Sequence, residues 1–153
     1  MDKIFEDYFS ELQADMVSIC LEYVESRAEK IYVYASFEDC VVASDYFYNI
    51  NGKTVERHKL NDVVANTQEK YDISVERQKA VVRILNDDIK KMIQICEEYQ
   101  REMPTEIKLV YDVQKNSLKA EYRYDVVYSD DPVKTADDVA MEWFEQIRLE
   151  DTK

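Results

Sequence analysis

The hydrophobic pattern of this chain changes its period twice, and this change limits the possible folds more than any other feature. Apolar residues alternate with polar ones over residues 31–50 and again over 107–124, as expected for strands with one buried face. Between these segments, over residues 75–103, apolar residues recur at steps of three and four, which is typical of one face of a helix: Val82, Leu85, Ile89, Met92, Cys96, Tyr99 and Met103. The chain is therefore predicted to be an α+β protein.

Helices are also predicted at both ends of the chain. Residues 2–27 place apolar side chains on one stripe and acidic side chains over much of the remaining surface. Near the other end, Thr135 with Asp138 three positions later resembles an acidic capping box, which marks the start of a helix. Four residues of that last helix are expected to face inward: Val139, Trp143, Phe144 and Ile147.

Three strands are predicted before the long helix, at residues 31–37, 41–50 and 53–58. The second and third meet at Asn51-Gly52, a sequence that favours a type I′ turn because both central residues need positive φ. Gly52 is the only glycine of the chain, which indicates that its backbone conformation is needed there.

The second half of the chain is predicted to add a helix and a hairpin. Residues 61–70 are polar and aperiodic, so we expect a loop. Asp72 or Ser74 is expected to cap the long helix, and Pro104 to end it after Met103. Strands are predicted at 105–113 and 118–128. The order α-β-β-β-α-β-β-α favours a single domain over residues 1–153, with one antiparallel sheet of about five strands flanked by helices.

Charge is concentrated at the two ends of the chain. The whole chain has 20 basic and 33 acidic residues, a net charge of −13. Residues 1–29 contribute −6 (8 acids, 2 bases) and residues 121–153 another −6 (10 acids, 4 bases). Such a field repels nucleic acid and anionic membranes and speeds encounter with a basic protein. The alternative is that the acidic residues only keep the protein soluble.

Residues that could carry chemistry are few. The chain lacks the several glycines of a phosphate-binding loop, and His58, its only histidine, stands in Arg57-His58-Lys59 as a surface residue of a strand end. Cys20, Cys40 and Cys96 are far apart and are expected to be free thiols, buried or half-buried. No metal, cofactor or catalytic residue is predicted. The acidic start of the chain and the absence of a long apolar run favour the cytoplasm.

Candidate residues for binding a partner were chosen by charge and expected exposure. Most of the strand tyrosines are expected to pack in the sheet, but Tyr128 lies beside the acidic pair Asp130-Asp131. Acids there and at the start of the last helix could form one acidic surface. The predicted partner-binding residues are Asp125, Tyr128, Asp130, Asp131, Asp137, Asp138 and Glu142.

The second half of the chain resembles a known family. Residues 103–113 (MPTEIKLVYDV) and 116–125 (NSLKAEYRYD) are similar to the hairpin of YezG-like immunity proteins. The element order and the last helix with Trp143-Phe144 are similar too. This resemblance implies an antitoxin that binds the nuclease domain of a polymorphic toxin in the producing cell, without catalytic residues of its own. The alternative is an acidic cytosolic chaperone of a secreted effector, which would hold an extended segment and would usually dimerise.

Overall fold

The fold is one antiparallel sheet with helices on both faces. A computed structural model describes residues 4–64 and 69–151 of the chain. The predicted order of elements and the five-stranded sheet are confirmed. The elements are α1 (Phe5–Tyr23), β1 (Lys30–Glu38), β2 (Val41–Ile50), β3 (Lys53–Glu56), the 3-10 helix η1 (Arg57–Asp62), α2 (Val75–Glu98), β4 (Glu106–Asp112), β5 (Ser117–Arg123) and α3 (Ala136–Asp151).

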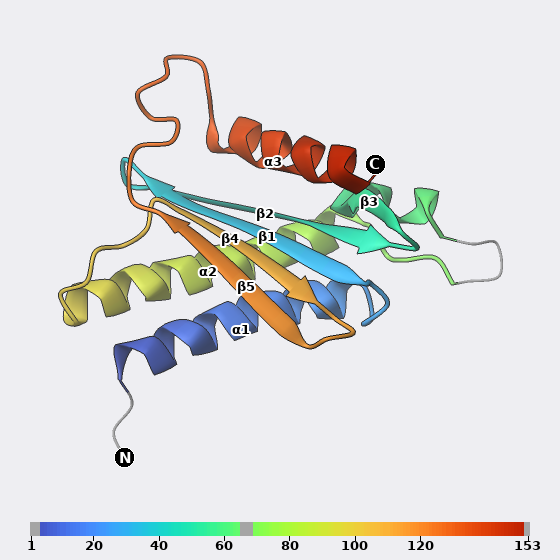
Figure 1. Cartoon of the computed structure of the whole chain (residues 1–153), viewed down its shortest axis with the longest axis horizontal. Coiled ribbons are helices and arrows are strands. Elements are labelled where there is room, and N and C mark those ends of the chain that lie inside the picture. Colours follow the sequence, from blue (N-terminus) through green and yellow to red (C-terminus); the bar gives the residue numbers. More distant parts are fainter. Residues whose placement is uncertain (1–3, 65–68, 152–153) are drawn as a thin grey trace.

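The strands lie in the order β3-β2-β1-β4-β5, so β1 is central and β3 and β5 form the two edges. β1 pairs antiparallel with both β2 and β4. Figure 1 shows α1 and α2 below the sheet and α3 above it. Because β1 is covered on both faces, its residues from Ile31 to Ser36 are all buried, in place of the alternation of a one-sided strand.

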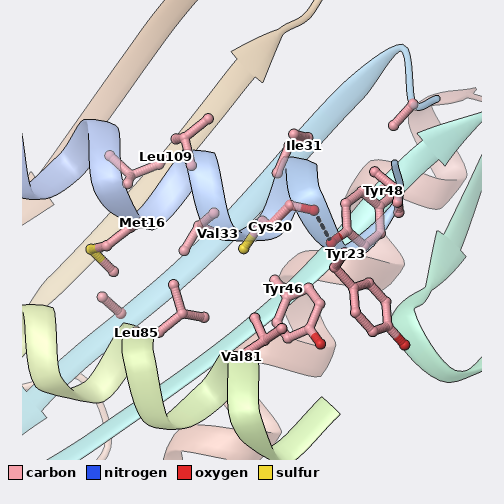
Figure 2. Close-up of a cluster of buried hydrophobic side chains, with 14 of the residues drawn as sticks. Met16, Cys20, Tyr23, Ile31, Val33, Tyr46, Tyr48, Val81, Leu85 and Leu109 are labelled. Atoms are coloured by element: carbon pink, nitrogen blue, oxygen red, sulfur yellow. Dashed lines mark hydrogen bonds between the residues drawn. The ribbon is translucent and has the colours of Figure 1, made fainter. Parts of the chain in front are cut away.

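The larger core lies between the sheet and the two helices α1 and α2. Met16 of α1, Leu85 of α2, and Val33 and Leu109 of the sheet are completely buried there (Figure 2). The Tyr48 hydroxyl donates to the Cys20 carbonyl at 2.6 Å, so this tyrosine reaches the core without leaving its polar end unpaired. From α2, the larger core contains Val81, Leu85, Ile89, Met92 and Cys96, which recur at the predicted helical spacing.

A smaller core lies on the other face, beneath α3. The Trp143 indole packs on Tyr32 and Phe47, with ring centroids 5.8 and 5.1 Å away. Phe144 contacts Phe47 at 5.1 Å, and Ile147 is half-buried against the same cluster. The predicted inward face of the last helix is confirmed. α3 packs mainly on β2 and β3, so it covers only the half of this face that is farther from β5.

Both long helices end earlier than predicted. α1 was predicted over residues 2–27 but ends at Tyr23, because Glu25 and Ser26 adopt positive φ. The predicted start at residue 2 lies outside the described residues. α2 ends at Glu98, with Gln100 at positive φ and the Arg101 amide donating to the Cys96 carbonyl at 2.8 Å. The apolar period through Met103 predicted a longer helix, but this backbone cap ends it before Pro104. Ser74 is confirmed as the N-cap, because its side chain accepts from the Arg77 amide.

Two strands are also shorter than predicted. β3 ends at Glu56, and residues 57–62 form η1, so His58 lies on a 3-10 helix and not on a strand. The predicted loop therefore starts only after Asp62, and its residues 65–68 lie outside the described part of the chain. β5 ends at Arg123, and residues 124–128 belong to the loop before α3. The Asn51-Gly52 turn is confirmed, with φ of 54° and 78°.

A buried carboxylate between α1 and α2 makes stability depend on pH. Asp88 is 2% exposed, and its Oδ2 has no hydrogen-bond partner among the described residues. Burial, then the hydrogen bond and charge of Asp15, raises the pKa of Asp88 to about 7. Since the unfolded value is about 3.9, the folded state binds this proton more tightly, and the resulting stability is lost as pH rises through about 7.

We expect Asp88→Asn to remove that loss. Between pH 5 and pH 8, the free energy of unfolding of the variant should rise by about 1–3 kcal/mol relative to that of the parent protein. Urea unfolding across this pH range measures the difference, with Asp87→Asn, an exposed neighbour on α2, as the matched control. Parallel pH profiles for the parent protein and Asp88→Asn would contradict the assignment.

Candidate protein-binding surface

The predicted binding residues lie on the loop 124–135 and the outward side of α3, which together we call the acidic surface. The loop starts at β5, on one edge of the sheet, and must reach α3, which packs on β2 and β3. It crosses the end of the sheet beside the turn between β1 and β2 (Figure 1). The conformation of this loop therefore decides where its acids are placed.

Glu38, the last residue of β1, fixes the loop. Its Oε1 accepts hydrogen bonds from the amides of Val127, Tyr128 and Ser129 at 3.0, 3.3 and 3.1 Å, and from the Ser129 hydroxyl at 2.7 Å. The residue is 4% exposed. Burial alone would raise the pKa of Glu38, but the hydrogen bonds from Ser129, Val127 and Tyr128 outweigh it and lower the pKa. An ionised carboxylate thus holds three consecutive loop amides.

Tyr128 contributes mainly to the structure of this loop. Its side chain is half-buried against the smaller core, and its hydroxyl accepts from the buried Ser36 hydroxyl at 3.2 Å. The structure therefore places this predicted binding residue partly inside the protein.

Asp131 and Asp138 bond to nearby backbone. Asp131 Oδ1 accepts from the amides of Val133 and Lys134 at 2.9 and 3.1 Å, and these bonds lower the pKa of Asp131. Asp138 accepts from the Thr135 amide at 2.9 Å, while the Thr135 hydroxyl accepts from the Asp138 amide at 3.3 Å. The predicted capping box is confirmed. Both carboxylates remain exposed, so they can shape the backbone and still contribute charge.

Asp125 and Glu142 each form a surface ion pair. Asp125 binds Arg123 at 3.0 Å, close to the end of β5, and Glu142 binds Lys134 at 2.9 Å. Asp125 therefore lies at the start of the loop with its charge matched locally. Exposed pairs of this kind contribute little to stability.

Asp130 and Asp137 are exposed and take part in none of the bonds described above. Burial raises the pKa of Asp45 on β2, and the charge of Asp137 adds to the rise. Asp137 also lines a shallow hollow with Asp39, Asp131 and Lys134, where the loop passes the turn between β1 and β2. The structure thus adds Asp39, a residue far away in sequence, to the predicted acids.

An exposed apolar row runs along the acidic surface. Val133 is 81%, Met141 44% and Leu149 54% exposed. They line a shallow hollow together with Asp138, Glu142 and Glu145. This row was not predicted, although Met141 and Leu149 are eight residues apart, a spacing that puts both on one side of a helix. Apolar side chains bordered by charged ones are typical of protein-binding surfaces.

The histidine, the cysteines and the acidic residues are further candidates for a metal or catalytic site in the part of the chain that the structure describes. No group of three histidine, cysteine or acidic residues there is arranged to hold a metal ion. His58 is half exposed and contacts Glu56 at 3.2 Å. The three cysteines are free thiols, as predicted, but Cys40 is exposed because it occupies the tight turn between β1 and β2. Within the described residues, no helix has the length and apolar composition needed to cross a membrane.

No protein-family model matches the chain, and a search of curated proteins gives no match. The similarity to YezG-like immunity proteins therefore depends on residues 103–125, the last helix with Trp143-Phe144 and the element order, and it stays a prediction.

Proposed function

We propose that this protein is an immunity protein, which binds a basic toxin domain through the acidic surface and blocks it without turnover. One observation supports this proposal most strongly. Glu38 accepts hydrogen bonds from the amides of residues 127–129 in the loop 124–135, which leads to the exposed apolar row of Val133, Met141 and Leu149. A surface held in place before binding loses less conformational entropy when a partner docks.

The charge of the chain suggests the chemistry of the partner. Residues 121–153 have a net charge of −6 within a total of −13. Nuclease domains are often basic where they hold phosphates, so an acidic protein can cover that surface and exclude nucleic acid. Val133, Met141 and Leu149 would add apolar contact that long-range charge attraction alone does not supply.

A reducing compartment fits the same function. The chain has three free thiols, one of them on the exposed Cys40. Thiols persist in the cytoplasm, where an immunity protein would protect the cell that makes the toxin.

Titration against a toxin tests the proposal. The proposed function predicts a nuclease domain encoded beside this gene, and the test measures its cleavage of DNA or RNA while the protein is added. We expect full inhibition at an equimolar amount, because the mechanism is occupation of a surface. Nuclease activity that persists at a large molar excess would contradict the proposal.

A chaperone of a secreted effector is the second candidate, supported by a different observation. An apolar hollow of about 410 Å³ lies between α1, the segment after α2, and β5, with Phe5, Phe9, Tyr122 and Tyr124 among its lining residues. An extended segment of an effector could enter it. In that case the protein would bind an unfolded effector segment and leave a folded nuclease domain active.

A further inference from the structure

The outer edge of β5 is an unpaired strand edge. Among the described residues, β5 is the last strand of the sheet and pairs only with β4. Strand edges of this kind attract other strands unless they are protected. β5 spans Ser117–Arg123 and has Ala120 as its middle residue.

The register shows which backbone groups of β5 point outward. At the two ends of β4, the Val113 amide donates to the Glu29 carbonyl and the Thr105 carbonyl accepts from the Phe37 amide, so the odd-numbered residues of β4 bond towards β1. The Thr105 amide, just before β4, donates instead to the Arg123 carbonyl of β5. Backbone groups alternate between the two neighbours of an antiparallel strand, so the even-numbered β4 residues bond towards β5. Their partners in β5 are the odd-numbered residues, from Ser117 to Arg123. The amides and carbonyls of Leu118, Ala120 and Tyr122 are therefore directed outward.

We propose that β5 pairs with β5 of a second copy, antiparallel about a two-fold axis at Ala120. This register pairs the outward groups of Ala120 with those of its own copy, and Leu118 with Tyr122 of the second copy. Lys119 then lies opposite Glu121 of the second copy, and Glu121 opposite Lys119. Opposite charges facing each other across a strand pair stabilise it. Among the described residues, neither Lys119 nor Glu121 takes part in an ion pair within its own chain.

Other registers fit less well. A two-fold axis at Lys119 would place Lys119 opposite Lys119 of the second copy, and an axis at Glu121 would place Glu121 opposite Glu121 of the second copy. Like charges directly opposite each other across a strand pair are destabilising. An axis at Leu118 or Tyr122 would pair only about half of the strand. The register about Ala120 alone uses the whole strand and matches both charges.

The flank of β5 towards α1 also suits a second copy. Leu118 and Tyr122 are 37% and 41% exposed there, beside apolar hollows that run along the helix. The residues that α1 presents to these hollows include Ser10, Ala14 and Ser18, which are exposed, small and uncharged. The charged residues Glu6, Arg101 and Glu102 also line the first hollow, so it is the part of α1 from Ser10 to Ser18 that is open to close approach.

The dimer would be a continuous sheet of ten strands. α3 packs on β2 and β3, far from β5 in the strand order, so the two acidic surfaces would lie towards opposite ends of that sheet. Each could bind a partner independently, and the dimer depends on neither proposed function.

Charge exchange tests both the dimer and its register. The mass of the full chain in solution is measured by analytical ultracentrifugation at 150 mM salt over a range of concentrations. We expect the parent protein to reach twice the monomer mass of 18.2 kDa. Lys119→Glu and Glu121→Lys should each weaken the dimer by about tenfold or more, because like charges then face each other at two places. The double variant Lys119→Glu/Glu121→Lys, and an equimolar mixture of the two single variants, should dimerise again.

Ala120→Pro is the backbone test. Proline is tolerated where the amide points away from the sheet, so the monomer should stay folded by circular dichroism while the dimer is lost. A parent protein that stays monomeric at all concentrations would overturn the proposal. A dimer that survives Ala120→Pro and both single charge reversals would overturn it too, because it would use another surface.

Discussion

Replacing Trp143 with alanine is expected to lower the free energy of unfolding by about 3–5 kcal/mol, the range found when large aromatic residues are removed from cores. The Trp143 indole is 6% exposed and lies at the centre of the smaller core. It packs on Tyr32, Phe47 and Tyr34, with ring centroids 5.1–6.3 Å away, and the Lys108 ammonium lies 5.5 Å from its ring. These contacts are the main attachment of α3, so the loss should be largest for that helix.

Urea unfolding measures this change, with hydrogen exchange of the α3 amides as a local measurement. Gln146→Ala is the matched control, because Gln146 lies on the exposed side of the same helix and should change stability by less than about 0.5 kcal/mol. A loss below about 1 kcal/mol in Trp143→Ala would show that α3 is held by other contacts.

Replacing Glu38 with alanine should cost about 2–3 kcal/mol and release the loop 124–135, because charge-assisted hydrogen bonds are the stronger kind and three amides lose their acceptor. Glu38→Gln keeps one acceptor oxygen and should lose less. The pKa of Glu38 is lowered in the folded protein, so its contribution is present above the unfolded pKa of about 4.3 and is lost as pH falls through the folded value. The difference between parent and variant should therefore shrink in acid.

Hydrogen exchange at pH 7 gives the local result for Glu38. The amides of Val127, Tyr128 and Ser129 should exchange faster in both variants. Asp39→Asn is the control, since Asp39 is the exposed next residue and asparagine tolerates its positive φ. Unchanged exchange of the three amides in Glu38→Ala would mean that the loop is held by other contacts.

The elements that could be predicted from the sequence are those with a local pattern. Alternation placed the strands, the helical period placed α2, and Asn51-Gly52 placed a turn. The errors lie where a distant residue decides the structure. Residues 124–128 are rich in tyrosine and valine, which predicts a strand. The amides of residues 127–129 instead donate hydrogen bonds to Glu38, about ninety residues earlier in the sequence, so this segment does not continue β5. No local pattern contains that information.

The candidate site was predicted in part for the same reason. Charge and expected exposure identified Asp130 and Asp137, which are exposed in the structure. They also identified Asp131 and Asp138, which accept hydrogen bonds from nearby backbone amides. The structure was needed to find Asp39, which lies on another turn, and to show that Tyr128 faces partly inward. The exposed row of Val133, Met141 and Leu149 was not predicted, because the sequence pattern identified only the inward residues of the last helix: Val139, Trp143, Phe144 and Ile147.

The role of the acidic surface in binding is the central claim, and two variants with equal charge change separate it from solubility. Asp130→Asn/Asp137→Asn/Glu142→Gln removes three exposed acids from the acidic surface and leaves the caps made by Asp131 and Asp138. Asp87→Asn/Glu97→Gln/Glu98→Gln removes three exposed acids from α2, on the opposite face of the sheet (Figure 1). Circular dichroism should show an intact fold in both.

The most direct measurement is the association rate of each variant with the nuclease domain that the proposed function predicts beside this gene, by stopped flow at several salt concentrations. At low salt the first variant should associate about tenfold more slowly than the parent protein, with a weaker salt dependence, because steering charges act mainly on the association rate. The α2 variant should associate nearly as fast as the parent protein. Equal association rates and equal salt dependence for both variants would contradict the claim that the acidic surface binds the partner.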